Sequence, residues 1–156
     1  MKISQNGLDL IKHFESFVPK AYKDQAGVVT IGYGTTRING VPVKMGQTCS
    51  ETEAVKWLSE DILKFEIDID RMTVGLINKQ NKFDALVCFV YNVGPEAFRK
   101  STILKKILSG THVAEKNFTD WNKIRINGVL TPSKGLTRRR KAEYALYERN
   151  KLQFHF

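Results

Sequence analysis

Two acidic residues near the N-terminus have the types and spacing that hydrolysis of a glycosidic bond requires. Glu15 stands between Phe14 and Phe17, whose rings would favour the protonated form of its carboxyl group. Nine positions on, Asp24 opens a turn that ends in glycine, where a carboxylate stays hydrated and ionised. Glycoside hydrolysis needs one such acid and one such carboxylate, and Thr30 offers a hydroxyl that can hold the attacking water. Spacing alone also allows an ordinary helix-end glutamate and turn aspartate.

A helix followed by a small antiparallel sheet is expected to position these residues. Ser4 is a candidate cap for a first helix, which must end before Pro19 because a proline pushes the preceding residue out of helical conformation. The β-branched run Val28–Tyr33 follows the Gly-ended turn and predicts a hairpin. The Asn-Gly pair within Ile38–Val41 predicts a second, tight hairpin. A helix end and a hairpin can bring both carboxyl groups and the threonine together.

Beyond residue 50 the pattern is helical. Ser50–Glu53 is a capping box, which marks a helix start, and apolar residues at helical spacing extend that helix to about residue 73. Gly94 and Pro95 stop a later helix. Further helices are predicted over residues 78–92, 101–108, 113–121 and 136–149.

Together these elements predict a single domain, residues 1–156, with an α+β, mainly helical fold. A small N-terminal lobe with a β-hairpin sheet spans about residues 1–48. A long helix, about residues 50–73, joins it to a larger all-helical lobe, about residues 74–156. A cleft between the lobes is the expected substrate site.

The charge balance narrows the class of partner. The chain has 25 Lys and Arg against 16 Asp and Glu, a net charge of +9, which predicts attraction to polyanions. Nucleic acid, an anionic membrane and an anionic cell wall are all polyanions that such a charge would attract. The longest apolar run, Ala85–Tyr91, is far shorter than the roughly 20 residues of a membrane-spanning helix, and no signal peptide is visible. The expected location is therefore the cytosol.

Neither cysteines nor histidines predict a metal site. Cys49 and Cys88 form no Cys-x-x-Cys pair, and the three histidines are scattered along the chain. Cys88 lies in an apolar run, which predicts a buried free thiol. We expect no metal and no cofactor.

Three stretches of the chain resemble the phage lysozymes, glycoside hydrolase family 24. The first is the active-site signature of that family: a Glu, an Asp nine positions on, and a Thr six beyond it, followed by Gly-Tyr-Gly. Here these positions are Glu15, Asp24, Thr30 and the glycines that flank Tyr33. The other two stretches are 85–98, which leads into Ser-Thr, and 135–143, which contains Arg139-Arg140. The resemblance covers almost the whole chain, in the order of the family.

The resemblance implies an endolysin that cuts the β-1,4 bond between N-acetylmuramic acid and N-acetylglucosamine in peptidoglycan. Glu15 would be the general acid, Asp24 would orient and deprotonate water or stabilise the transition state, and Thr30 would hold that water. The partners implied are peptidoglycan and a holin-type membrane protein that releases a monomeric enzyme from the host cytoplasm to the periplasm. No nucleic acid is expected. Substrate contacts are expected from Tyr22, Tyr33, Gly34, Asn92, Arg139 and Arg140.

Several alternatives stay open at this point. A lytic transglycosylase cuts the same bond with one catalytic Glu, so Asp24 and Thr30 favour hydrolysis. A non-catalytic wall binder would not need Glu15, and a toxin or secretion effector could use the same domain. A nucleic-acid-binding domain lacks a convincing reading helix here. The run Arg138–Lys141 is interpreted as a solvated basic helix face, unless Arg139 or Arg140 approaches Glu15.

Overall fold

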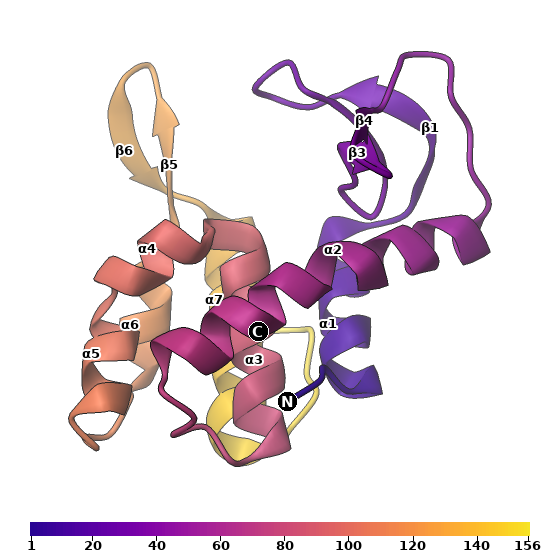
Figure 1. The fold of residues 1–156 in the computed structure, drawn as a ribbon. Coiled ribbons are helices and arrows are strands. Elements are labelled where there is room, and N and C mark those ends of the chain that lie inside the picture. Colours follow the sequence, from indigo (N-terminus) through magenta and orange to yellow (C-terminus); the bar gives the residue numbers. More distant parts are fainter. The chain divides into compact units, whose positions relative to one another are not determined.

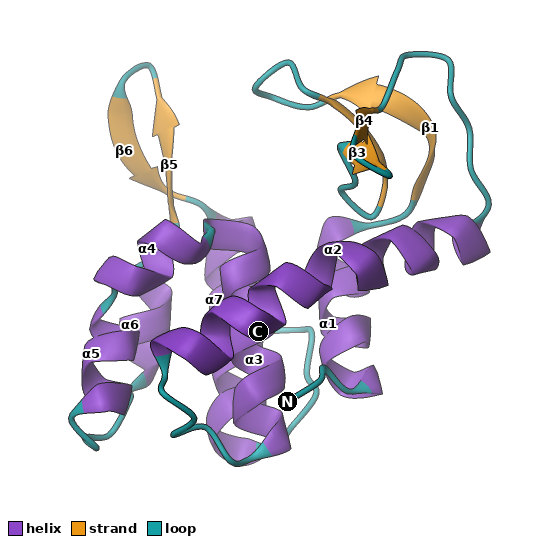
Figure 2. Ribbon diagram, viewed as in Figure 1, coloured by secondary structure: helices purple, strands orange, loops and turns teal.

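The computed structural model describes all 156 residues, which form seven helices and three two-stranded antiparallel hairpins. Figure 1 shows their arrangement within each part of the chain. The expected mainly helical α+β class is confirmed (Figure 2). No helix has the length and apolar character needed to cross a membrane. The helices are α1 (Gln5–Glu15), α2 (Glu51–Met72), α3 (Gln80–Val93), α4 (Pro95–Lys100), α5 (Thr102–Leu108), α6 (Glu115–Thr119) and α7 (Lys134–Arg149). The strands are β1 (Val18–Lys23), β2 (Val29–Gly32), β3 (Arg37–Ile38), β4 (Val41–Pro42), β5 (Lys123–Ile126) and β6 (Val129–Pro132).

The chain divides into two compact units. The hairpin unit is Lys12–Lys64, and the helical unit combines Met1–Ile11 with Phe65–Phe156. The boundaries fall inside α1 and α2, so each of these helices contributes to both units. A lobe of residues 1–48 and a lobe of residues 74–156 stay predictions.

Hydrogen bonds explain why the first residues belong to the helical unit. Asp84 of α3 accepts bonds from the backbone amide of Ser4, at 2.9 Å, and from its hydroxyl. Glu66 of α2 accepts the backbone amide of Ile3 at 2.7 Å. Ser4 directly precedes α1, and its hydroxyl donates to Asp84, so this residue joins the start of α1 to α3; its role as the cap stays a prediction.

The hairpin unit contains both turns that the sequence predicts. Strands β3 and β4 pair Ile38 with Val41 across Asn39 and Gly40, whose φ angles are +50° and +78°. Two successive residues with positive φ are what a tight hairpin turn demands, and Asn-Gly supplies them. Strands β1 and β2 pair around the turn that contains Asp24, with a register irregularity between Val18 and Tyr22.

A small apolar core fixes this unit. Ala21 of β1, Ile31 of β2 and Val43 are buried together, and Trp57 of α2 packs against them. Trp57 is partly buried and anchors α2 to this core. Gly32 ends β2 at φ +67°, where an added Cβ would lie 2.9 Å from the Cβ of Ala54, so the close approach of β2 to α2 requires glycine.

The start of α2 is the predicted capping box. The backbone amide of Ser50 donates to Glu53 Oε2 at 2.8 Å, and the amide of Glu53 donates to Ser50 Oγ at 3.2 Å. Each residue satisfies an otherwise unpaired amide of the other. The predicted long helix of residues 50–73 is thus confirmed as Glu51–Met72.

In the helical unit, α3 packs against α7 and α4 (Figure 1). Phe89 of α3 is the centre of its aromatic core, in edge contact with the rings of Phe98, Phe118 and Trp121 at 5.5–6.3 Å. Cys88 is buried and free, as expected, and burial raises the pKa of its thiol well above the usual value. These packed rings make α3 the central helix of the unit.

The third hairpin, β5–β6, is an element that the sequence analysis missed. Its strands pair Ile126 with Val129 across Asn127 and Gly128, and in Figure 1 it projects from the helices of its unit. Asn127 has φ +49° and Gly128 φ +80°, which is the same turn as in β3–β4. The Asn-Gly pair was therefore the signal that could have found it.

Candidate active site

Glu15 is the last residue of α1 and is half-buried. The amide of Ser16 still donates to the Lys12 carbonyl, at 3.1 Å, but Ser16 has φ +59°, which ends the helix. The next residue, Phe17, packs its ring 5.6 Å from that of Tyr33. A left-handed residue followed by an anchored aromatic ring turns the chain sharply into β1 and sets the position of Glu15 at the corner.

Asp24 is held by the turn between β1 and β2. Its Oδ1 accepts the backbone amides of Ala26 and Val28, both at 2.9 Å, and its own amide donates to the Val28 carbonyl. These hydrogen bonds fix the orientation of the carboxylate. They also leave Oδ2 without a protein donor, so one oxygen of a fixed carboxylate can bind water.

Thr30 lies on β2, directly opposite Tyr22 on β1. Its side chain is buried, and its Oγ1 donates to the Val28 carbonyl at 3.0 Å. Since the hydroxyl hydrogen is used, the oxygen presents its lone pairs as an acceptor. Side chains alternate across a strand, so Tyr22, Thr30 and Asp24, two residues beyond Tyr22, share one face of the hairpin.

The charges of both carboxyl groups act on the phenol of Tyr22. Burial raises the pKa of the Tyr22 phenol, and the negative charges of Glu15 and Asp24 raise it further. Both carboxylates therefore lie within electrostatic reach of one hydroxyl, although they come from a helix end and a turn. The hairpin unit thus brings together the three predicted catalytic residues, Glu15, Asp24 and Thr30, around Tyr22.

Comparison with known proteins identifies the family of the chain. The family model described as phage lysozyme matches residues 12–143, which include all three residues. The chain belongs to the phage lysozyme family. An endolysin of Acyrthosiphon pisum secondary endosymbiont phage 1 is 38% identical over 95% of this chain and 99% of its own length.

Solved structures agree on the fold of this phage lysozyme. An endolysin from Escherichia coli O157:H7 phage FAHEc1 is 39% identical, with a TM-score of 0.89 over 98% of this chain and 97% of that one. The muramidase domain of SpmX from Asticaccaulis excentricus is 31% identical, with a TM-score of 0.82 over 94% of this chain and 97% of that one. The expected lysozyme-like fold is therefore confirmed.

Tyr33, expected to contact substrate, is buried in the phage lysozyme. Its hydroxyl donates to Glu51 Oε1 at 2.8 Å, Lys12 Nζ lies 5.6 Å from its ring centroid, and Lys12 also pairs with Glu51 at 3.8 Å. Burial and the bond to Glu51 raise the pKa of Tyr33 to about 12. This contact ties α1 to the start of α2, while the neighbouring Gly34, at φ +92°, is partly exposed. No sequence pattern singled out Lys12 or Glu51.

Arg139 and Arg140 form a buried ion cluster with Glu143, so the predicted solvated basic face is wrong at these two positions. Arg139 Nε donates to Glu143 Oε1 at 3.2 Å, and Arg140 Nη2 donates to the same oxygen at 2.9 Å. Arg140 Nε lies 2.9 Å from Oε2 in an ion pair that lacks hydrogen-bond geometry. Burial raises the pKa of Glu143, although the positive charges of Arg140 and Arg139 both act to lower it. A Glu three and four positions after the arginines on one helix face is the signal for this pairing.

Asn92, the remaining predicted substrate contact, is exposed near the end of α3. Its Oδ1 accepts a bond from Arg140 Nη2 at 2.9 Å, so the buried cluster fixes the orientation of its amide. Asn92 lines a cavity of about 700 Å³, together with Trp121, Lys123 and Leu136. This volume is within the range of ligand pockets in general. The cavity is formed by the helical unit alone.

Proposed function

We propose that this peptidoglycan-hydrolysing endolysin is a muramidase that cleaves the β-1,4 bond between N-acetylmuramic acid and N-acetylglucosamine, with Glu15 as the general acid. The observation that carries this proposal is that Tyr22, which pairs with Thr30 across the hairpin, lies within electrostatic reach of both Glu15 and Asp24. Two carboxyl groups that serve one glycosidic bond are the minimum that the reaction needs. The muramidase domain among the similar structures supports the choice of bond.

Glu15 protonates the glycosidic oxygen as the bond to the sugar breaks. Its place at the end of α1, half-buried and next to Phe14, keeps it close to the hairpin without sequestering it. General acid catalysis by one positioned group contributes about 10²- to 10⁴-fold in rate.

Asp24 and Thr30 activate the water that attacks the sugar from the opposite face. Oδ2 of Asp24 accepts a proton of that water, while Oδ1 stays bound to the turn amides. Thr30 Oγ1 accepts the other water hydrogen, because its own hydrogen is donated to Val28. Attack by water on the far face predicts inversion at the anomeric carbon.

The other predicted contacts have two different roles. Tyr22, Gly34 and Asn92 are partly or fully exposed, and we assign them to contacts with the glycan or its peptide. Tyr33 positions α1, and Arg140 positions Asn92, because both side chains are buried and bonded within their own units. Arg139 supports Glu143 in the same cluster.

The products of peptidoglycan digestion test the reaction. Hydrolysis between the two sugars predicts fragments that end in a reducing N-acetylmuramic acid, initially as the inverted anomer by NMR. Fragments lighter by one water would identify a transglycosylase and refute the hydrolytic role of Asp24. A folded protein that binds walls but releases no fragments would refute catalysis altogether.

The proposed route to substrate has three parts. The enzyme is made in the host cytoplasm as a monomer, a holin-type membrane protein opens the membrane, and the enzyme then acts on periplasmic peptidoglycan. The net charge of +9 supports attraction to the carboxylates of the wall, an effect that salt would screen. Expression without a holin should leave cells intact, and co-expression should lyse them. Lysis by the enzyme alone would contradict this route.

A further inference from the structure

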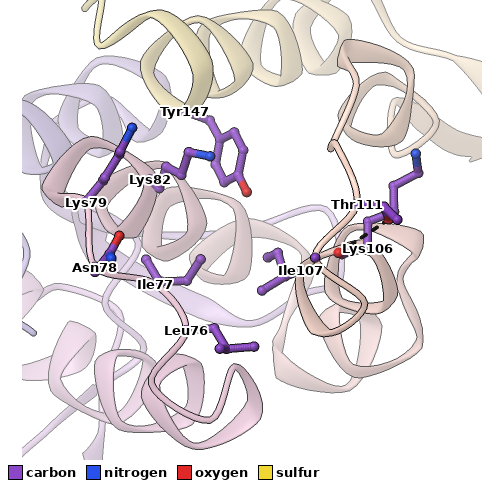
Figure 3. A pocket seen from close by; sticks show the side chains of 10 residues that line it. Leu76, Ile77, Asn78, Lys79, Lys82, Lys106, Ile107, Thr111 and Tyr147 are labelled. Carbon is purple, nitrogen blue, oxygen red and sulfur yellow. Dashed lines mark hydrogen bonds between the residues drawn. The ribbon is translucent and has the colours of Figure 1, made fainter.

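A second cavity lies in the helical unit, at the opposite end of α3 from Asn92. It has a volume of about 200 Å³ and lies where α3 begins, between α5 and α7 (Figure 3). Lys82 and Asn92 are ten residues apart on one helix, which corresponds to about 15 Å along its axis. The cavity is therefore separate from the cavity that Asn92 lines.

The charge around this cavity has one sign. Lys79, Lys82 and Lys106 line it, and no acidic residue does. Figure 3 shows Lys79 and Lys82 on one side of the Tyr147 ring and Lys106 on the other. The Lys82 ammonium lies 4.8 Å from the centroid of that ring, and Lys106 Nζ donates to the His112 carbonyl. Three cations and no carboxylate line the cavity, which favours an anion from solvent, although the negative charge of Glu148 on α7 also acts on Tyr147.

The Tyr147 hydroxyl is a further polar donor of the cavity. Tyr147 is 3% exposed, yet its hydroxyl makes no hydrogen bond within the protein, and Figure 3 shows it pointing into the space beside Ile77 and Ile107. A buried tyrosine hydroxyl normally finds a partner. The pKa of Tyr147 is raised to about 12, chiefly by burial, so the phenol keeps its proton and can donate. In addition, Lys79 occupies the N-cap position of α3, but its side chain makes no capping hydrogen bond. The positive end of the helix dipole therefore also lies at this region.

We propose that this cavity is an anion site that binds a phosphate group, with Tyr147, Lys79 and Lys82 as its donors. Its volume is smaller than that of pockets for drug-sized ligands, which fits a single phosphate group. Lysine binds phosphate as a point charge, and a dianion matches several lysines better than a carboxylate does. If the proposed function holds, the natural source is a phosphate ester on a polymer of the bacterial envelope. Free phosphate has the same chemistry.

Titration with inorganic phosphate tests the site without any use of activity. At constant ionic strength, with chloride as the reference anion, we expect saturable NMR shifts of the Lys82 amide and its neighbours. Tyr147→Phe keeps the ring packing and should weaken binding several-fold without lowering the unfolding temperature. Lys79→Gln/Lys82→Gln should weaken it about tenfold or more. The matched control Lys100→Gln/Lys105→Gln has the same net charge and lies outside the cavity, so it should retain phosphate affinity.

Two results would overturn the proposal. One is the absence of saturable shifts, and the other is an equal loss of affinity in the lysine pair and its control, which would mean diffuse attraction only. A second comparison identifies the source, with Glu15→Gln used as the background so that walls are not digested. Stronger retention on walls with phosphate polymers than on walls stripped of them, lost in Lys79→Gln/Lys82→Gln, indicates an envelope polymer. Equal retention indicates the free anion as ligand.

Discussion

The molecule contains two clusters of charged side chains that are built in opposite ways. In the hairpin unit, the charges of Glu15, at a helix end, and Asp24, in a turn, both act on Tyr22, and one oxygen of Asp24 has no protein donor. In the helical unit, Glu143 is fully buried and forms ion pairs with both Arg139 and Arg140, although its Oε2 accepts no hydrogen bond.

This difference separates groups that react from groups that hold the fold. A carboxylate that is fixed through one oxygen keeps the other for water, at little cost in desolvation. A carboxylate removed from water needs its cations, and losing it leaves two buried positive charges uncompensated. Substitutions in the first cluster should therefore change turnover, and those in the second should change stability.

Asp24→Asn is expected to have the largest effect on chemistry. The amide oxygen can still accept the amides of Ala26 and Val28, so the turn should persist, but the base is lost. We expect kcat to fall about 10²- to 10⁴-fold with an unchanged unfolding temperature. Glu60→Gln, an exposed change of equal charge in the same unit, is the control for kcat measurements. A stability loss that accounts for the lost activity would erase the distinction between the clusters.

Glu143→Gln tests whether the buried cluster of the helical unit stabilises the fold. Removing the charge between Arg139 and Arg140 should reduce the free energy of unfolding by about 3–5 kcal/mol, measured by urea denaturation. Arg138→Gln removes an exposed charge from the same helix and should change it by less than about 0.5 kcal/mol. Equal effects of the two variants would show that the buried cluster contributes no more than surface charge.

Thr30→Val tests whether Thr30 holds the attacking water. The shape of the side chain is kept, while the acceptor for water and the bond to Val28 are lost. We expect kcat to fall about tenfold, the equivalent of one hydrogen bond, with little change in KM. Thr36→Val, at an exposed position, is the control. An increase in KM alone would assign Thr30 to substrate binding instead.

Tyr33→Phe should have the smallest effect. It removes the bond to Glu51 and should lower the free energy of unfolding by about 1 kcal/mol at neutral pH. The folded-state pKa of about 12 exceeds the usual value of 10, so the folded state holds this proton more tightly. The stabilisation is complete below pH 10 and is lost as pH rises toward 12. Unfolding curves across this range should decline less steeply for the variant, and identical declines would contradict the assignment.

Local signals predicted much of the fold. The capping box at Ser50–Glu53 and the turn at Asn39-Gly40 depend on adjacent residues, so the sequence alone sufficed for both. The same turn at Asn127-Gly128 was missed although its signal is equally local, because the alternating residues Lys123–Ile126 beside it were not interpreted as a strand.

The sequence could not predict which side chains from distant parts of the chain contact one another. Whether Arg140 faces water or Glu143 depends on how α7 packs against α3, and a helix pattern is compatible with either. The hydroxyl of Ser4 likewise binds Asp84, eighty residues away along the chain. Glu15, Asp24 and Thr30 were found because a family signature, not their spacing, joined them.

Release of reducing ends from purified peptidoglycan by the wild type and by Glu15→Gln is the most direct test of the central claim. Glu15→Gln keeps the size of the side chain but cannot donate the proton, so release should fall at least about 10²-fold with no change in unfolding temperature. Glu60→Gln, measured in parallel, should match the wild type. Wild-type activity in a folded Glu15→Gln protein would contradict the assignment of Glu15 as the general acid.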